Sequence, residues 1–191
     1  MMFDGDFIED LRRWGDEAGV VWEPGLKAAE VKHAEQRWEI RFPPDLRAFL
    51  MTMASSSKGF IHWTETPKDD IAARLDWPRR GFHFDIEHND LWLAEWGEPP
   101  TILAERFEVF DDAYAKVPKL IPIYGHRFIP QEPLEAGNPI FSVYQSDIIY
   151  FGSDLAGYLR YEFGPNGRQV DRDPRHIPFW SDWANGKYDE F

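Results

Sequence analysis

The sequence predicts a single-domain α+β protein. Apolar residues recur at helical spacing through the N-terminal part, whereas short apolar or alternating runs typical of strands follow, and helical spacing then returns. Helices and strands that are segregated along the chain favour α+β over alternating βαβ units. The 191 residues and the 43% hydrophobic content suffice for one core of ordinary size, and no repeat or linker divides the chain.

Three helices are predicted before residue 54. The first covers residues 4–18, the second covers residues 26–38, and the third starts at Pro43-Pro44, because proline suits the first turn of a helix. Gly19 ends the first helix. Apolar residues repeat at helical spacing in all three: Phe7, Leu11, Trp14, Ala18, Val31, Ala34, Trp38, Leu46, Phe49, Leu50 and Met53.

Strand patterns dominate the middle of the chain. In residues 81–87, Phe82, Phe84 and Ile86 alternate with polar residues, as on a half-buried strand. Pro122 marks its strand as an edge strand or a bulge, and residues 145–147 form a hairpin connection. The five predicted strands are residues 60–63, 81–87, 120–124, 140–144 and 148–151.

The other elements are helical. Residues 101–112 are ambiguous, but the spacing of their apolar residues favours a helix. Ser153 is predicted to cap the next helix, with Asp154 favourable in its first turn, and Gly164-Pro165 ends it. In the tail, a last short helix is expected to dock on the core through Ile177, Phe179, Trp180 and Trp183.

Composition excludes several classes of protein. The absence of cysteine excludes disulfides, thiolate catalysis and cysteine-based zinc sites, and it fits a reducing compartment. A net charge of −13 repels nucleic acid and anionic membranes and attracts basic partners, although it also serves solubility alone. The first ten residues lack a signal-peptide pattern and no apolar run could span a bilayer, so we expect a cytoplasmic protein.

Catalytic and cofactor motifs are missing from the sequence. It contains no GxSxG elbow, no GxxxxGK[ST] loop and no GxGxxG turn, so no catalytic residue and no cofactor is predicted. A metal-dependent hydrolase stays open as an alternative, with Asp85 and Glu87 on one strand face, His88 nearby, and His126 or Asp147 supplied by a second element. Metal-binding spacings such as HxH or HExxH are absent, and we therefore predict a polar strand face and no metal.

An acidic run with two tryptophans is the strongest candidate for a binding site. Nine acids lie between residues 85 and 112, against one base, Arg106. Tryptophan often anchors interfaces, and carboxylates around it steer a basic partner. The alternative is a solvated face with both tryptophans in the core. The candidate partner-binding residues are Asp85, Glu87, Asp90, Trp92, Glu95 and Trp96, with His83 and His88 nearby.

Four segments together resemble the SMI1/KNR4 family of the SUKH superfamily. They lie within residues 30–50 (ending in IRFPPDLRAFL), 77–93 (beginning WPRRGFHFDI), 120–130 (LIPIYGHRFIP) and 137–152 (GNPIFSVYQSDIIYFG). The resemblance covers most of residues 26–163 in the family's order. It implies a family core over residues 26–163, preceded by a helical extension over residues 1–20 and followed by a docked tail over residues 164–191.

The resemblance also implies a fold and a functional class. The fold is N-terminal helices packed on a bent, mostly antiparallel sheet. Bacterial members of the family are often immunity proteins that neutralise toxins of contact-dependent or polymorphic systems, many of them nucleases, and fungal relatives are regulators and interaction hubs. We therefore expect a non-catalytic protein whose partner is a basic toxin domain. A regulatory domain with another partner is the alternative.

Overall fold

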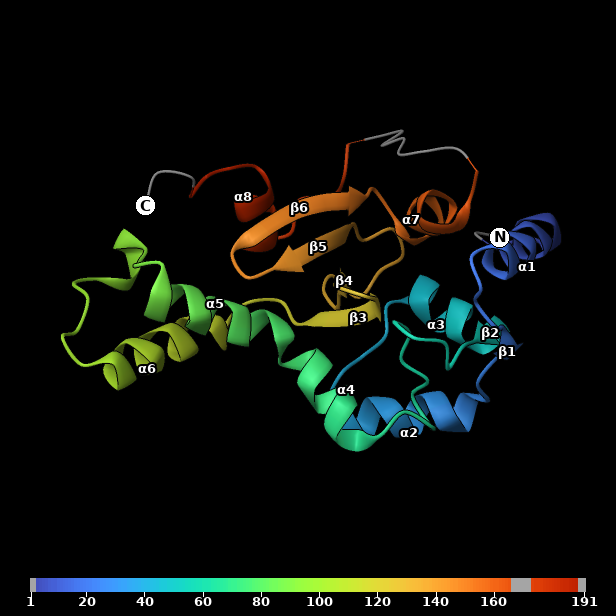
Figure 1. Ribbon diagram of the computed structural model, residues 1–191, viewed down its shortest axis with the longest axis horizontal. Coiled ribbons are helices and arrows are strands. Elements are labelled where there is room, and N and C mark those ends of the chain that lie inside the picture. Colours follow the sequence, from blue (N-terminus) through green and yellow to red (C-terminus); the bar gives the residue numbers. More distant parts are fainter. Residues whose placement is uncertain (1–2, 166–172, 189–191) are drawn as a thin grey trace.

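A computed structural model describes residues 3–165 and 173–188 (Figure 1). Its main sheet is an antiparallel meander in which each strand pairs with the next along the chain. Helices precede and follow the sheet, which confirms the predicted α+β class. The strands are β3 (Leu120–Tyr124), β4 (Arg127–Pro130), β5 (Ile140–Tyr144) and β6 (Asp147–Gly152).

The three N-terminal helices agree closely with the prediction: α1 (Gly5–Glu17), α2 (Ala28–Trp38) and α3 (Pro44–Thr52). The Asp4 side chain caps α1 by accepting a hydrogen bond from the Phe7 backbone N at 2.9 Å. A small antiparallel sheet, β1 (Glu23–Pro24) with β2 (Met53–Ala54), joins the chain before α2 to the chain after α3.

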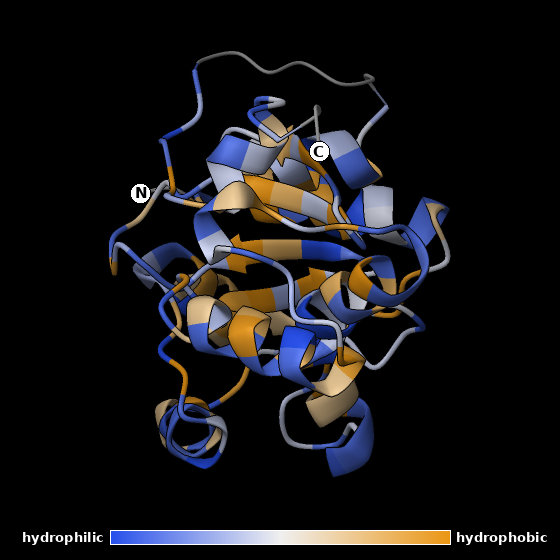
Figure 2. Cartoon of the chain, turned by 90° about the vertical axis from the view of Figure 1, so that its left-hand side faces the viewer, coloured by the Kyte–Doolittle hydropathy of each residue, from blue (hydrophilic) through white to orange (hydrophobic). Residues whose placement is uncertain are grey.

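Helices cover both faces of the main sheet (Figures 1 and 2). Alternate strand residues point to opposite faces, so the sheet contributes to two cores. Ile121, Ile129 and Ile140 pack with α1, α2, α3 and α7 (Leu155–Phe163). Phe128 and Phe141 pack on the other side with α5 (Trp77–His88), α6 (Leu103–Tyr114) and α8 (Trp180–Ala184).

The predictions for the later strands and helices are confirmed in several places. β3 lies at the edge of the sheet and has a bulge between Pro122 and Tyr124. β5 and β6 form the expected hairpin, and α6 occupies the ambiguous segment. The last helix, α8, docks through the buried residues Ile177, Trp180 and Trp183. Residues 166–172 and 189–191 of the predicted tail lie outside the described residues.

The strand predicted over residues 81–87 is wrong, because these residues belong to helix α5. Pro78 lies in its first turn, where proline is favoured. The helix buries Phe82, Asp85 and Ile86, which share one helical face, and exposes Phe84. The alternation of apolar and polar residues in the sequence therefore does not match the face that the helix buries.

Three smaller corrections concern the neighbouring elements. The strand predicted over residues 60–63 is reduced to a single bridge between Phe60 and Tyr124. Helix α4 (Lys68–Leu75) was not predicted. The cap of α7 is Asp154 and not Ser153, because the Asp154 carboxylate accepts the hydrogen bond from the Gly157 backbone N at 2.7 Å.

No helix of the described residues is both long and apolar enough to cross a membrane.

Asp45 in α3 is a buried carboxylate that joins this helix to the β4–β5 connection. It accepts hydrogen bonds from the backbone N of Leu46 and of Gly137, both at 2.9 Å. Burial raises the pKa of the Asp45 carboxyl above its ordinary value, although both hydrogen bonds oppose the increase. The folded protein therefore binds this proton more tightly than the unfolded chain.

A pH dependence of stability follows from the raised pKa of Asp45. Its contribution to the free energy of unfolding is fully present below the unfolded-state pKa and is lost as the pH rises from about 4 through the folded-state pKa. Relative to Asp45→Asn, the wild-type protein should lose stability over that interval. Urea unfolding of both proteins at steps from about pH 4 to about pH 7 measures the difference. The prediction is contradicted if the stability of the wild type relative to Asp45→Asn stays constant or increases as the pH rises.

Candidate functional site

Helices α5 and α6, with the short helix η1 (Ala94–Trp96) between them, form an arm at the end of the molecule away from α1 (Figure 1). We call residues 77–114 the α5–α6 arm. The arm contains all six candidate partner-binding residues, and its helices position them differently from the strand assumed in the sequence.

Three predicted acidic residues of the arm are exposed. Glu87 lies in the last turn of α5, Asp90 follows with a left-handed backbone (φ 53°), and Glu95 belongs to η1. On α6, three further exposed acids share one helical face through their spacing of three and four residues: Glu105, Glu108 and Asp112. The arm therefore presents carboxylates to solvent from both of its long helices and from η1.

Asp85 is not one of the exposed contacts. Its side chain is 2% exposed and accepts hydrogen bonds from Asn89 Nδ2 at 2.6 Å and from the Ser146 backbone N at 2.8 Å. Asp85 therefore fastens α5 to the β5–β6 turn. The prediction that it contacts a partner is wrong for this physical reason, since the helix directs its side chain inward.

The two tryptophans lie at different depths in the arm. Trp96 packs edge-on against the buried Phe110, with ring centroids 5.5 Å apart, and so joins the second core. Trp92 packs edge-on against Trp96 at 5.4 Å, and its Nε1 donates to the Gly97 carbonyl O at 2.7 Å. Both are partly exposed. Trp92 is therefore the outer ring of a layer whose inner ring, Trp96, belongs to the core.

His83 serves the contact between α5 and α6. Its ring stacks on Phe107 with centroids 4.2 Å apart, and its Nε2 lies 2.8 Å from Asp111 Oδ1. Arg79 lies between Asp76 and Asp111, at 2.7 Å and 3.1 Å, and these carboxylates raise the pKa of its guanidinium. His83 is therefore part of a hydrogen-bonded seam within the arm. His88, in contrast, is exposed beside Glu87, with 3.7 Å between Nε2 and Oε2.

The alternative metal set is not brought together by the fold. Asp85 is already held by Asn89 and Ser146, and His126 lies in the turn between β3 and β4, where burial and the charges of Arg127 and Arg74 lower its pKa. In the part of the chain that the structure describes, a single group of histidines and acids has converging ligand atoms, and it contains none of these residues.

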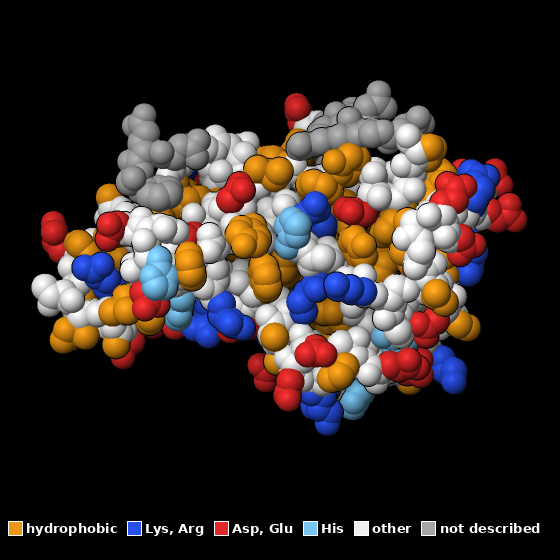
Figure 3. Space-filling model, in the orientation of Figure 1, with side chains coloured by type: hydrophobic (Ala, Val, Ile, Leu, Met, Phe, Trp, Pro, Cys, Tyr) orange, Lys and Arg blue, Asp and Glu red, His pale blue; other side chains and the backbone are white. Residues whose placement is uncertain are grey.

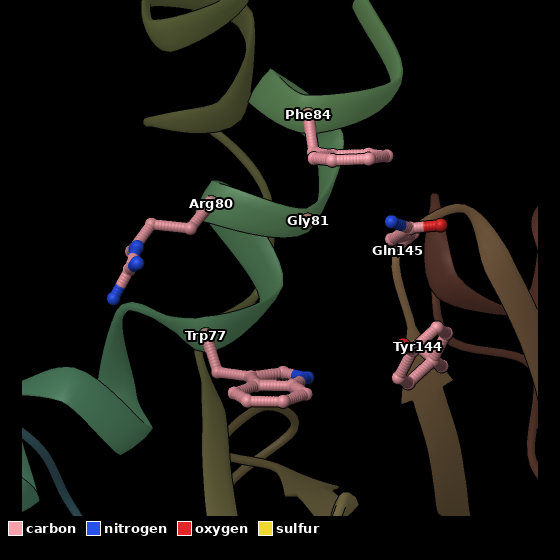
Figure 4. A pocket seen from close by; sticks show the side chains of 6 residues that line it. All are labelled: Trp77, Arg80, Gly81, Phe84, Tyr144 and Gln145. Atoms are coloured by element: carbon pink, nitrogen blue, oxygen red, sulfur yellow. The ribbon is translucent and has the colours of Figure 1, made fainter. Parts of the chain in front are cut away.

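A groove of about 190 Å³ lies between α5 and the β5–β6 turn (Figure 4). Trp77 and Phe84 of α5 face Tyr144 and Gln145 across it, whereas the Arg80 side chain extends away from the turn. The three aromatic side chains are exposed by 40%, 45% and 55%, respectively. Space-filling atoms also show hydrophobic side chains open to solvent over α5 and this hairpin (Figure 3).

Two features fix the groove. Trp77 Nε1 donates to the Val143 carbonyl O at 3.1 Å. A Cβ on Gly81 would lie 2.8 Å from Gln145 Cα, so that only glycine allows α5 to approach the turn this closely. The groove was not predicted, because a strand over residues 81–87 gives no reason to place Phe84 beside Tyr144. Three of its six lining residues are aromatic, and the others are Arg80, Gly81 and Gln145.

Comparison of the chain with protein-family models, with curated proteins and with solved structures finds no match in any of the three. The resemblance to the SMI1/KNR4 family therefore rests on the sequence segments alone.

Proposed function

We propose that this chain is a non-catalytic, protein-binding domain of the SMI1/KNR4 type that acts in the cytoplasm as an immunity protein. Its partner is a basic toxin domain, such as a nuclease of a bacterial polymorphic or contact-dependent system. The observation that carries the proposal is the α5–α6 arm, where the exposed carboxylates of Glu87, Asp90 and Glu95 accompany the partly exposed ring of Trp92. The predicted family resemblance supports the choice of a toxin as partner.

The proposed mechanism is occlusion of a basic surface. Carboxylates on the arm take the place of the phosphates that a nuclease binds, and they attract the partner over a distance set by ionic screening. Trp92, which lies in the same acidic run, supplies an apolar anchor. The groove beside Trp77 and Tyr144 accepts a side chain of the partner once the charges have met. None of these steps requires a catalytic group.

Reversal of three arm charges should slow association with the partner. The variant is Glu87→Lys/Asp90→Lys/Glu95→Lys, and the partner is captured from a lysate of the source organism at low salt, identified by mass spectrometry and then made recombinantly. We expect association at least about 10-fold slower than for the wild type at low salt, with a flatter salt dependence, because electrostatic steering is lost. Biolayer interferometry over a salt series measures both quantities.

A control variant separates local steering from net charge. Glu9→Lys/Asp16→Lys/Glu17→Lys changes the net charge by the same amount through exposed acids of α1, at the other end of the molecule (Figure 1). It should retain most of the wild-type association rate. Equal slowing by both variants would show that net charge alone attracts the partner. An unchanged association rate in the arm variant would show that these acidic residues are only solvent-exposed and do not contact the partner.

A regulatory interaction domain with a non-toxin partner is the alternative function. A regulatory partner would bind the same α5–α6 arm. The identity of the captured protein distinguishes the regulatory function from the immunity function. A basic domain that inhibits growth when expressed alone, and is harmless when co-expressed with this chain, supports the immunity function. A partner without toxicity supports the regulatory function. A hydrolase built on Asp85, Glu87, His88 and His126 is not proposed, because the side chains do not converge.

A further inference from the structure

Three side chains that the sequence does not connect meet beside the small sheet of β1 and β2. Glu23 lies in β1, and His62 and Glu65 lie in the segment between β2 and α4. One ligand atom from each lies within 4.8 Å of the other two. His62 is buried, at 6% exposure, whereas Glu65 is open to solvent. The cluster shares no residue with the α5–α6 arm.

The protein holds these ligands through a second layer of hydrogen bonds. His62 Nδ1 lies 3.1 Å from Thr64 Oγ1, and this contact leaves Nε2 directed toward Glu23 Oε2 at 3.9 Å, beyond hydrogen-bonding distance. The Ser56 backbone N donates to Glu23 Oε1 at 2.8 Å, so that Oε2 is the oxygen that faces the imidazole. A partner on the second ring nitrogen and a fixed carboxylate are features of metal-ligating histidines and acids.

The charges of the cluster favour a cation. Two of the three converging side chains are carboxylates, and the third is an imidazole that can offer a neutral ring nitrogen. Among the residues that the structure describes, no lysine or arginine forms an ion pair with Glu23 or with Glu65. With the His62 proton on Nδ1, the lone pair of Nε2 faces a carboxylate, and a cation between them removes that repulsion.

We propose that Glu23, His62 and Glu65 bind one divalent transition-metal ion, for which Zn²⁺ is the best match. With bonds of about 2.0–2.2 Å from imidazole nitrogen and carboxylate oxygen, two ligands of a tetrahedral ion lie about 3.4 Å apart, so the 3.9 Å between Nε2 and Oε2 has to shorten by only about 0.5 Å. Glu65 closes from the solvent side, and water completes the shell. An imidazole favours Zn²⁺ over Mg²⁺ or Ca²⁺. The ion would fasten β1 to the segment before α4. This inference does not depend on the proposed function.

Zinc titration of untagged protein tests the site. The protein is dialysed against EDTA and then buffer, and ZnCl₂ is added during isothermal titration calorimetry and thermal unfolding. We expect one ion per chain and a midpoint of unfolding raised by roughly 5–10 °C at a zinc concentration about 100 times the dissociation constant. MgCl₂ should bind at least about 10-fold more weakly. Absence of stoichiometric zinc binding up to millimolar concentration overturns the proposal.

Glu65→Gln is the decisive variant, because its exposed side chain can be changed without disturbing the core. It should unfold at the wild-type midpoint in EDTA and bind zinc at least about 10-fold more weakly. His88→Gln is the matched control, since this histidine is exposed beside an acid in the arm; it should bind zinc as the wild type does. Unchanged affinity in Glu65→Gln, or an equal loss in His88→Gln, would place the zinc elsewhere and overturn the assignment.

Discussion

Replacement of Phe82 by alanine is expected to lower the free energy of unfolding by about 3–5 kcal/mol, as is usual for a phenylalanine removed from a core. Phe82 is fully buried on α5. Its ring lies 5.3–6.4 Å from four others, so that the substitution opens a cavity between α5, α6 and α8. The four neighbouring rings are those of Phe110, Phe179, Trp180 and Trp183.

Phe84→Ala is the matched control, because it removes the same side chain two residues further along the same helix. Phe84 is 45% exposed at the groove, and its loss should cost less than about 1 kcal/mol. Urea unfolding followed by tryptophan fluorescence measures both variants. A strand would put Phe82 and Phe84 on one face and make the two losses similar. Similar losses would therefore contradict helix α5.

The spacing of apolar residues along the chain was sufficient to predict a helix or a strand where it fitted only one of the two periods. The helical repeat of Phe7 and Leu11, and the strand pair around residues 145–147, needed no information from distant residues, so both appear as predicted. Residues 81–87 fit a period of two, but Phe82 and Ile86 also share one face of a helix. Pro78 was the signal that favoured a helix, since proline suits the first helical turn. Packing against α6 and α8 decides between the two patterns.

The candidate sites could be predicted from the sequence less completely than the fold. The exposed acids of the arm could be identified from composition, because Glu87, Asp90 and Glu95 lie in one acidic run. The groove required α5 and the β5–β6 turn to be placed side by side. The proposed zinc ligands come from two segments separated by α2, α3 and β2. No spacing in the sequence reveals a contact that only the tertiary fold creates.

The inward position of Asp85 leads to the second large effect. Asp85→Ala removes the acceptor for Asn89 Nδ2 and for the Ser146 backbone N, and each such bond to a charged group contributes about 1.5–3 kcal/mol. Ser146 and Asn89 are partly open to water, so water can replace part of the lost hydrogen bonding in the variant. We therefore expect a total loss of about 2–3 kcal/mol in the free energy of unfolding. Urea unfolding at neutral pH measures the loss.

Glu87→Ala distinguishes the structural acid from the surface acids of the arm. Glu87 is exposed, so its removal should change stability by less than about 0.5 kcal/mol while slowing association with a basic partner. Asp85→Ala should do the reverse at a temperature where the variant remains folded. If Asp85→Ala instead left stability unchanged and slowed association as Glu87→Ala does, Asp85 would be an exposed contact and the attachment of α5 to the β5–β6 turn would be wrong. The two acids, two residues apart, thus report separately on the fold of the arm and on its binding surface.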